Sequence, residues 1–102
     1  MNRGEIWLAH VGRKQRPVVI LTRSEVIDVR SQVTVAEITT NARGLSVEVE
    51  LDPVAVGLSQ PSVINCDGLH TVAKSTLAAY VGTVDDATLE RVCAAVARAF
   101  GC

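Results

Sequence analysis

Residues 15–21 are Gln15-Arg16-Pro17-Val18-Val19-Ile20-Leu21, a stretch in which cations run directly into apolar, mostly β-branched residues. The apolar run is typical of a strand buried on both faces. Pro17 has no N–H to donate to a neighbouring strand, so we expect it at the first residue of this strand. Arg13, Lys14 and Arg16 then precede the strand in a loop. A guanidinium held there is suited to a phosphate, although loop cations are equally typical of solvated surface.

The composition predicts one domain, residues 1–102, with a substantial aliphatic core. Hydrophobic residues make up 48% of the chain but include only one Trp, one Tyr and one Phe, which argues against an aromatic platform for stacking bases. The net charge of −1 conceals a gradient, because residues 1–30 carry +3 and residues 31–102 carry −4. The basic N-terminal third can therefore form a local anion site.

Several classes of protein are disfavoured by motifs that the sequence lacks. Its three cysteines are an odd number without C-x-x-C spacing, which argues against a disulfide framework and fits the reducing cytoplasm. No apolar run approaches the ~18 residues of a membrane span, and no signal-peptide pattern is present. Clustered metal ligands and Gly-rich phosphate loops are also missing. We therefore expect a cytoplasmic protein that uses neither a metal nor a cofactor.

Apolar alternation predicts six strands, over residues 5–11, 16 or 17 to 22, 32–40, 45–51, 62–66 and 77–84. We expect Gly12 to break the first strand, and Ser24 to be the N-cap of a short helix that reaches residue 28. Residues 41–44 have turn chemistry, with Gly44 suited to a positive φ, and should join the third and fourth strands as a hairpin that ends at residues 52–53.

The inward face of the fourth strand and that of a C-terminal helix follow from their periodicities. Along the fourth strand, the residues expected to face inward are Leu45, Val47, Val49 and Leu51. After residue 84 the period changes to 3.6, and the apolar face of the predicted helix is Leu89, Val92, Cys93, Val96 and Phe100. Asp85 is the expected N-cap and Gly101 the expected end. The predicted fold is a mostly β, antiparallel domain with one amphipathic C-terminal helix.

A few polar residues near predicted strand ends could carry chemistry. His10 and His70 could form an acid–base pair, although nothing in the sequence brings them together and a structural role is the simpler interpretation of each. Strand alternation places Asn65 and Asp67 on one face. Asp67 could accept a proton or position a phosphate, or could belong to an Asp-Gly turn. Thr39 and Thr40 close the third strand and place two hydroxyls at the same end, although both are also ordinary β-branched strand residues.

Taken together, five segments resemble the MazF/PemK/Kid family of toxin ribonucleases in order and spacing over nearly the whole chain. These segments are Arg3 to Leu8, Gln15 to Ile20, Val35 to Thr39, Ser62 to Asp67, and His70-Thr71. The resemblance implies an SH3-like barrel of the CcdB/Kid type, a homodimer, and a cognate antitoxin with a disordered acidic tail. It also implies metal-independent cleavage of single-stranded RNA, in which the 2′-OH attacks the phosphate and leaves a 2′,3′-cyclic phosphate and a 5′-OH.

The resemblance also implies roles for individual residues. Arg16 would stabilise the phosphorane or act as an acid, Thr39 would hold the phosphate, and Asp67 would be the general base. The Kid-like branch has an arginine, proposed as the acid, where this chain has Asn65, and the loop before Arg16 is shorter than in the family and lacks its histidine. The expected RNA contacts are Arg13, Lys14, Gln15, Thr40, Arg43, Asn65 and His70.

Two other functions remain open on the same fold. A gyrase-poisoning toxin would act through its chain end and a tryptophan there, but this chain ends Phe100-Gly101-Cys102. A non-catalytic interaction barrel would suit the near-neutral net charge.

Overall fold

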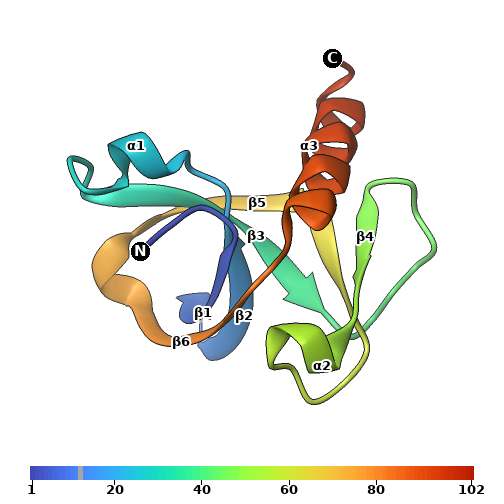
Figure 1. The fold of residues 1–102 in the computed structure, drawn as a ribbon, viewed down its shortest axis with the longest axis horizontal. Coiled ribbons are helices and arrows are strands. Elements are labelled where there is room, and N and C mark those ends of the chain that lie inside the picture. The colour runs from blue at the N-terminus through green and yellow to red at the C-terminus, as the bar shows by residue number, and fades with distance from the viewer. Residues whose placement is uncertain (12) are drawn as a thin grey trace.

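The computed structural model describes residues 1–11 and 13–102, so the break expected at Gly12 lies outside the described residues. Six strands form one antiparallel sheet in the order β4-β5-β3-β2-β1-β6, and helix α3 covers part of one face (Figure 1). The strands are β1 (Glu5–Val11), β2 (Lys14–Ile20), β3 (Gln32–Thr39), β4 (Glu48–Leu51), β5 (Ser62–Ala73) and β6 (Leu77–Thr83). The helices are α1 (Ser24–Ile27), α2 (Pro53–Val56), the 3-10 turn η1 (Lys74–Thr76) and α3 (Asp86–Phe100). The expected mostly β domain with a C-terminal helix is confirmed.

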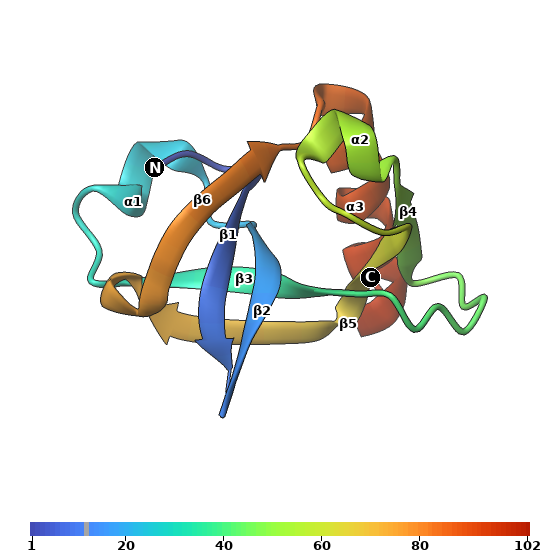
Figure 2. The same ribbon diagram turned by 90° about the horizontal axis from the view of Figure 1, so that it is seen from below.

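The strongly curved sheet separates two aliphatic clusters (Figure 2). One lies between the sheet and α3 and includes Ile6, Ile64 and Val92, all essentially inaccessible to solvent. The other lies on the opposite face of the sheet, where Val18 and Val35 pack with residues of α1 and β6. Apolar burial on both faces explains why the central strands are continuous runs of β-branched residues.

The β1–β2 hairpin begins its second strand earlier than the sequence suggests. Lys14 pairs with the end of β1, and Arg16 pairs with Ala9, so both cations lie within β2 rather than in a loop. Pro17 is paired with Leu8 in the middle of the strand instead of beginning it. The expected strand start is wrong, because pairing with β1 begins at Lys14, before the proline. Pro17 interrupts this pairing only by the one hydrogen bond that its missing N–H would have donated.

The expected hairpin between β3 and β4 is wrong. β4 pairs with β5 and lies at the edge of the sheet, while β3 lies between β5 and β2. Gly44 has the expected positive φ of 72°. However, the Glu48 carboxylate accepts from the backbone N–H groups of Arg43 and Leu45, so a turn replaces the start of the predicted strand. Leu45 is consequently 49% exposed.

Strand β5 is twelve residues long and bends sharply, which the sequence did not predict. Asn65 pairs with Glu37, and Leu69 pairs with the preceding β3 residue, Ala36. Cys66, Asp67 and Gly68 between them have no β3 partner. The Asp-Gly pair thus lies in a three-residue bulge inside a continuous strand, and such bulges bend a strand and redirect its side chains.

The two short helices differ from the sequence expectation. The N-cap of α1 is Arg23, while the Ser24 hydroxyl accepts from the Arg3 N–H. Residues 53–56, expected to follow the end of a hairpin, form α2 instead. Its N-cap is Asp52, whose carboxylate accepts from the Val54 N–H at 3.1 Å.

Helix α3 has the predicted N-cap, Asp85, whose carboxylate accepts from the Thr88 N–H at 2.8 Å and has a lowered pKa because of its bonds to Thr88. The buried residues of α3 are Thr88, Val92 and Ala95. Of the predicted apolar face, Cys93 is exposed in the middle of the helix. Phe100 is 65% exposed, because the last turn of α3 extends beyond the sheet (Figure 1).

Candidate functional site

One face of the sheet gathers polar side chains from three neighbouring strands. Residues paired in antiparallel strands share a face, as do residues two apart along a strand. Val18 of β2 pairs with Glu37 of β3, which pairs with Asn65 of β5. Arg16 lies two residues before Val18, and Thr39 lies two residues after Glu37. All four polar side chains therefore arise from the face of the sheet opposite α3.

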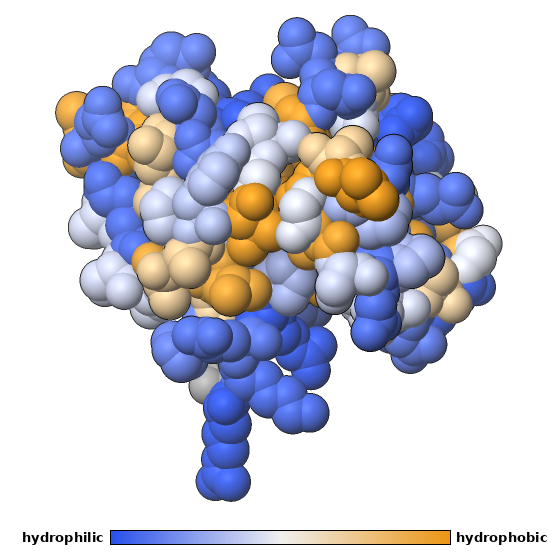
Figure 3. Space-filling model, turned by 60° about the horizontal axis from the view of Figure 1, so that its bottom comes forward, coloured by the Kyte–Doolittle hydropathy of each residue, from blue (hydrophilic) through white to orange (hydrophobic). Residues whose placement is uncertain are grey.

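The β1–β2 hairpin supplies exposed cations to this face. Arg13, Lys14, Gln15 and Arg16 are all exposed. Within the described residues, the Arg16 guanidinium forms no hydrogen bond or ion pair, so its donors remain open to an added anion. Figure 3 shows the hairpin projecting from the body as a hydrophilic arm, beside a face that carries apolar patches. The backbone of Arg16 is fixed by strand pairing, but its side chain is not held.

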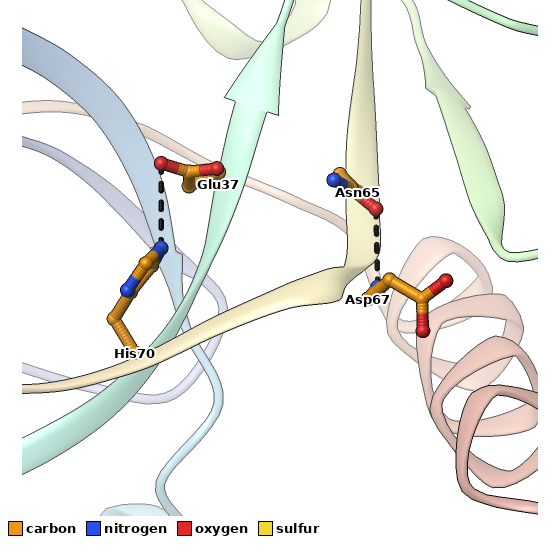
Figure 4. Close-up of polar contacts among 4 residues, drawn as sticks. All are labelled: Glu37, Asn65, Asp67 and His70. Carbon is orange, nitrogen blue, oxygen red and sulfur yellow. Dashed lines mark hydrogen bonds and ion pairs between the residues drawn. The ribbon is translucent and has the colours of Figure 1, made fainter.

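A tighter polar cluster lies at the bend of β5 (Figure 4). His70 Nε2 is 3.3 Å from Glu37 Oε1, an ion pair when the imidazole is protonated. Gly68 forms one wall of the cluster, because a Cβ on this residue would lie 3.0 Å from both Glu37 Oε2 and Asn65 Nδ2. Three side chains from β3 and β5 therefore converge where the bulge leaves room for them.

Asp67 does not join this cluster. Figure 4 shows its carboxylate pointing away from Glu37 and His70, on the side of β5 where α3 is drawn. Its N–H donates to Asn65 Oδ1 at 3.1 Å. The expectation that Asn65 and Asp67 share a face is wrong, because the bulge interrupts strand alternation between them. Asp67 is nevertheless exposed.

The remaining predicted site residues are spread beyond the cluster. Thr39 Oγ1 accepts from the Asn41 N–H at 3.1 Å, so its hydroxyl proton is free to be donated elsewhere. Thr40 lines a separate hollow of about 300 Å³ with Ser62. Arg43 is exposed in the connection before β4.

The two histidines do not meet. His10 of β1 pairs with Gln15, and it lies on the opposite face from Ala9 and Arg16, whereas His70 is on β5. Strands β2 and β3 separate β1 from β5 in the sheet. An acid–base pair of the two histidines is therefore excluded by the fold.

Sequence reasoning missed Glu37. One signal could have identified it, since Glu37 is a charged residue inside an apolar strand, directly between the buried residues Ala36 and Ile38. A carboxylate rarely occupies such a position without a partner. Its partner, His70, becomes apparent only when the bulge in β5 is known.

The cysteines have no evident part in the site. Cys66 is fully buried beneath the bulge, and burial raises the pKa of its thiol to about 11, so it stays neutral near pH 7. Within the described part of the chain, no three His, Cys, Asp or Glu side chains are grouped so as to hold a metal ion. No helix there is long and apolar enough to cross a membrane.

Comparison with solved structures first identifies the class, a ribonuclease-type toxin fold. The structure of the Mycobacterium tuberculosis toxin MazF-mt6 matches with a TM-score of 0.90 at 38% identity, covering 95% of this chain and 96% of that one. An endoribonuclease in complex with its cognate antitoxin, from a mycobacterial species, matches with a TM-score of 0.89 at 27% identity, covering 99% and 95% of the two chains.

Sequence comparison then identifies the family. The model of the PemK-like, MazF-like toxin of type II toxin–antitoxin systems matches residues 2–100. The probable endoribonuclease MazF2 of Mycobacterium tuberculosis is 33% identical over 102 residues, which is the whole of both chains. The chain belongs to the PemK-like, MazF-like toxin family of type II toxin–antitoxin systems.

Proposed function

We propose that this chain is a toxin endoribonuclease that cleaves single-stranded RNA, mRNA above all, without a metal ion. The 2′-OH would attack the adjacent phosphate and leave a 2′,3′-cyclic phosphate and a 5′-OH, so that translation and growth stop. Family membership over residues 2–100 supports the class of reaction. One observation supports the location of the RNA site. Arg16 and Thr39 arise from the same face of the sheet, next to an exposed cationic hairpin.

Arg16 and Thr39 supply the complementary parts of a phosphate site. The exposed guanidinium of Arg16 can donate two parallel hydrogen bonds to phosphate oxygens and stabilise the negative charge that develops on the phosphorane. Because Thr39 Oγ1 already accepts from the Asn41 N–H, its hydroxyl proton can be donated to a phosphate oxygen and so fix the orientation of the phosphate.

Asp67 is the proposed general base. Its carboxylate is exposed at the bend of β5 and can accept the proton of the 2′-OH from a strand of RNA that crosses the bend. Asn65, on the Glu37 side of the bend, is placed to hydrogen bond a base edge, as amide side chains commonly do in RNA recognition.

The hairpin provides most of the attraction to the RNA backbone. Arg13, Lys14 and Gln15 are exposed next to Arg16, and neutralising phosphates with such cations releases bound counterions. Thr40, Arg43 and His70 are proposed as further contacts along the strand of RNA.

The direct test is cleavage of a single-stranded RNA by the purified protein in the presence of EDTA. We expect fragments with 2′,3′-cyclic phosphate and 5′-OH ends, and at least about a 100-fold lower rate for Arg16→Ala, in line with the loss of a group that stabilises charge in the transition state. Loss of cleavage in EDTA, with recovery on addition of a divalent ion, would contradict the metal-free mechanism. An unchanged rate for Arg16→Ala would remove Arg16 from the chemistry.

Two partners accompany this proposal, a second copy of the chain and an antitoxin. A homodimer is supported by the exposed apolar side chain of Phe100, which lines a groove of about 490 Å³ together with Leu21, Leu69 and Val96. Sedimentation at micromolar concentration tests it.

The antitoxin would cover the hairpin with a disordered acidic tail, since a polyanion competes naturally for a phosphate track. Added antitoxin should therefore stop cleavage. Both associations would occur in the cytoplasm.

The two alternative functions are not favoured. For the gyrase-poisoning alternative, the curated relative reported above gives no support, because it is named as a MazF endoribonuclease. A non-catalytic barrel gives no reason for a guanidinium and a hydroxyl to be presented together on one sheet face.

A further inference from the structure

We propose that His70, held by the Glu37 carboxylate, is the acid that protonates the leaving 5′ oxygen when RNA is cleaved. This inference rests on the proposed ribonuclease function and assigns a proton donor to the same site. Glu37 acts through His70 and is a positioning residue.

The two nitrogens of His70 have different surroundings. Nε2 is enclosed from solvent, forms no hydrogen bond among the described residues, and has the Glu37 carboxylate as its neighbour at 3.3 Å. Nδ1 is neither enclosed nor bonded to the described residues. A carboxylate beside one ring nitrogen orients the imidazole, while the other nitrogen stays available for proton transfer.

The His70–Glu37 pair is partly exposed, so a substrate can reach it, and partly buried, so its side chains are held in place. The side chain of His70 is 39% exposed and that of Glu37 is 22% exposed. Gly68 lets the Glu37 carboxylate lie directly over the bulge, because no Cβ occupies that space. The dyad is therefore built into two strands and not left on a mobile surface loop.

Register places this dyad on the proposed substrate face. His70 pairs with Val35, which lies two residues before Glu37 and four before Thr39 on β3. His70, Glu37 and Thr39 therefore arise from one face of the sheet. The Asp67 carboxylate points the other way from the bend (Figure 4). In-line displacement requires the acid and the base to act on opposite sides of phosphorus, and the proposal assigns these two roles to His70 and Asp67, which lie on different sides of the bend of β5.

The proton balance is complete with these groups. Asp67 accepts the proton of the 2′-OH, and the 2′ oxygen forms its bond to phosphorus. The bond between phosphorus and the 5′ oxygen breaks, its electron pair stays on that oxygen, and the oxygen takes the proton from His70 Nδ1. Neutral His70 then regains a proton from solvent, and Asp67 loses its proton to solvent.

The charged groups around His70 are few. From β3, Glu37 is the carboxylate within ion-pair distance, and the described residues contain no other such pair with His70. On β5 itself, Asp67 is directed away. Next to the end of β5, Lys74 Nζ donates to the Ile27 carbonyl at 2.8 Å and is occupied there. From β2, the cation Arg16 arises from the same face of the sheet. Glu37 is therefore the charged group that the described residues place against His70.

A substrate with sulfur in place of the bridging 5′ oxygen tests the role of His70. A thiolate leaves without being protonated, so an enzyme that lacks its general acid recovers its rate on this substrate. We expect His70→Gln to cleave ordinary RNA at least about 100-fold more slowly than the unaltered protein, the usual contribution of a general acid. On the sulfur-bridged RNA, the two proteins should differ by less than about threefold. Glu37→Gln should show the same pattern with a smaller loss.

The control variant is His10→Gln, which replaces the other histidine, on the opposite face of β1. It should cleave both substrates at the unaltered rate. The inference is overturned if His70→Gln loses the same factor on both substrates, or if it cleaves ordinary RNA normally. If the unaltered protein cleaves no RNA, the proposed function and the dyad fail together, whereas normal cleavage by His70→Gln removes only the dyad. Thermal unfolding of each variant establishes that it is folded.

Discussion

The β1–β2 hairpin and the bend of β5 both contribute to the proposed site, but they present their side chains in different ways. In the hairpin, Arg16 is exposed and forms no hydrogen bond or ion pair with the other described residues. At the bend, Glu37 and His70 contact each other, and Gly68 provides the space between the strands. The hairpin thus offers charge that an RNA must organise, whereas the bend offers groups that are already positioned.

Because of this difference, we expect the hairpin mainly to attract RNA and the bend mainly to contribute to the cleavage step. Exposed cations contribute mainly screened attraction, which falls as salt rises. Preorganised groups contribute most in the transition state, because little reorganisation remains to be done. Arg16 combines the two, since its backbone is fixed in a strand but its guanidinium acquires partners only from the substrate.

Among the variants that compare the hairpin with the bend, the largest effect on cleavage is expected for Arg16→Lys. The charge is kept, but an ammonium lacks the planar fork that binds two phosphate oxygens, so single-turnover cleavage should fall about 100-fold. Quenched-flow or gel-based cleavage at saturating protein measures this rate. Arg30→Lys, an exposed arginine before β3, is the matched control and should cleave normally. Near-normal cleavage by Arg16→Lys would reduce Arg16 to a phosphate anchor.

The buried thiol of Cys66, at the bend of β5, should make the free energy of unfolding depend on pH in the alkaline range. Burial raises the pKa of Cys66 from 9.0 to about 11. Below pH 9 the thiol is neutral in both states and contributes no pH dependence. Between pH 9 and about 11 only the unfolded state loses this proton, so the free energy of unfolding falls as pH rises, by up to about 3 kcal/mol.

Denaturant unfolding at several pH values checks this expectation. Cys66→Ala should flatten the alkaline decrease, whereas Cys102→Ser, at an exposed cysteine, should leave it unchanged. Equal slopes for the unaltered protein and Cys66→Ala would show that the thiol is not the cause.

A smaller effect is expected for Gly68→Ala. The new Cβ would lie 3.0 Å from Glu37 Oε2 and Asn65 Nδ2, and both side chains would have to shift by a few tenths of an ångström. Gly68 does not have a positive φ, so the backbone itself accepts alanine. We expect about a 10-fold lower cleavage rate, below the 10²-fold that a misplacement of 1 Å can cause. An unchanged rate would mean that the positions of Glu37 and Asn65 do not matter for cleavage.

The smallest effect is expected for Lys14→Ala, which removes one exposed hairpin cation. RNA binding should weaken a few-fold, and the slope of log affinity against log salt should become shallower by about 1. Fluorescence anisotropy at several salt concentrations measures both quantities. The single-turnover rate at saturation should stay within about twofold of the unaltered rate. A large fall in that rate would assign Lys14 to the chemistry.

The sequence was most informative where local pattern and burial agree. The boundaries of β1 and the N-cap at Asp85 follow from apolar alternation and capping chemistry, and both are confirmed. The β3–β4 hairpin failed because turn residues at 41–44 indicate that the chain reverses but not which strand it pairs with next. Strand order is set by long-range burial, which a local pattern does not contain.

The site shows the same limit. Arg16 and Thr39 could be named from the sequence by resemblance, and their shared face agrees with the register. Glu37 could not be named, because its role depends on a bulge in a strand that is distant in sequence. The bulge also turned Asp67 away from Asn65, a reversal that strand alternation cannot predict.

The central claim is that one strand of RNA contacts the hairpin and the bend together. The most direct measurement is a backbone NMR titration with an RNA that carries the cleaved sequence and a 2′-O-methyl group at the scissile position. We predict that the amides of residues 14–16, Val18, Thr39 and residues 65–70 shift together with a single dissociation constant, while the exposed face of α3 is unaffected. Shifts confined to the hairpin, with the bend of β5 unchanged, would contradict the account.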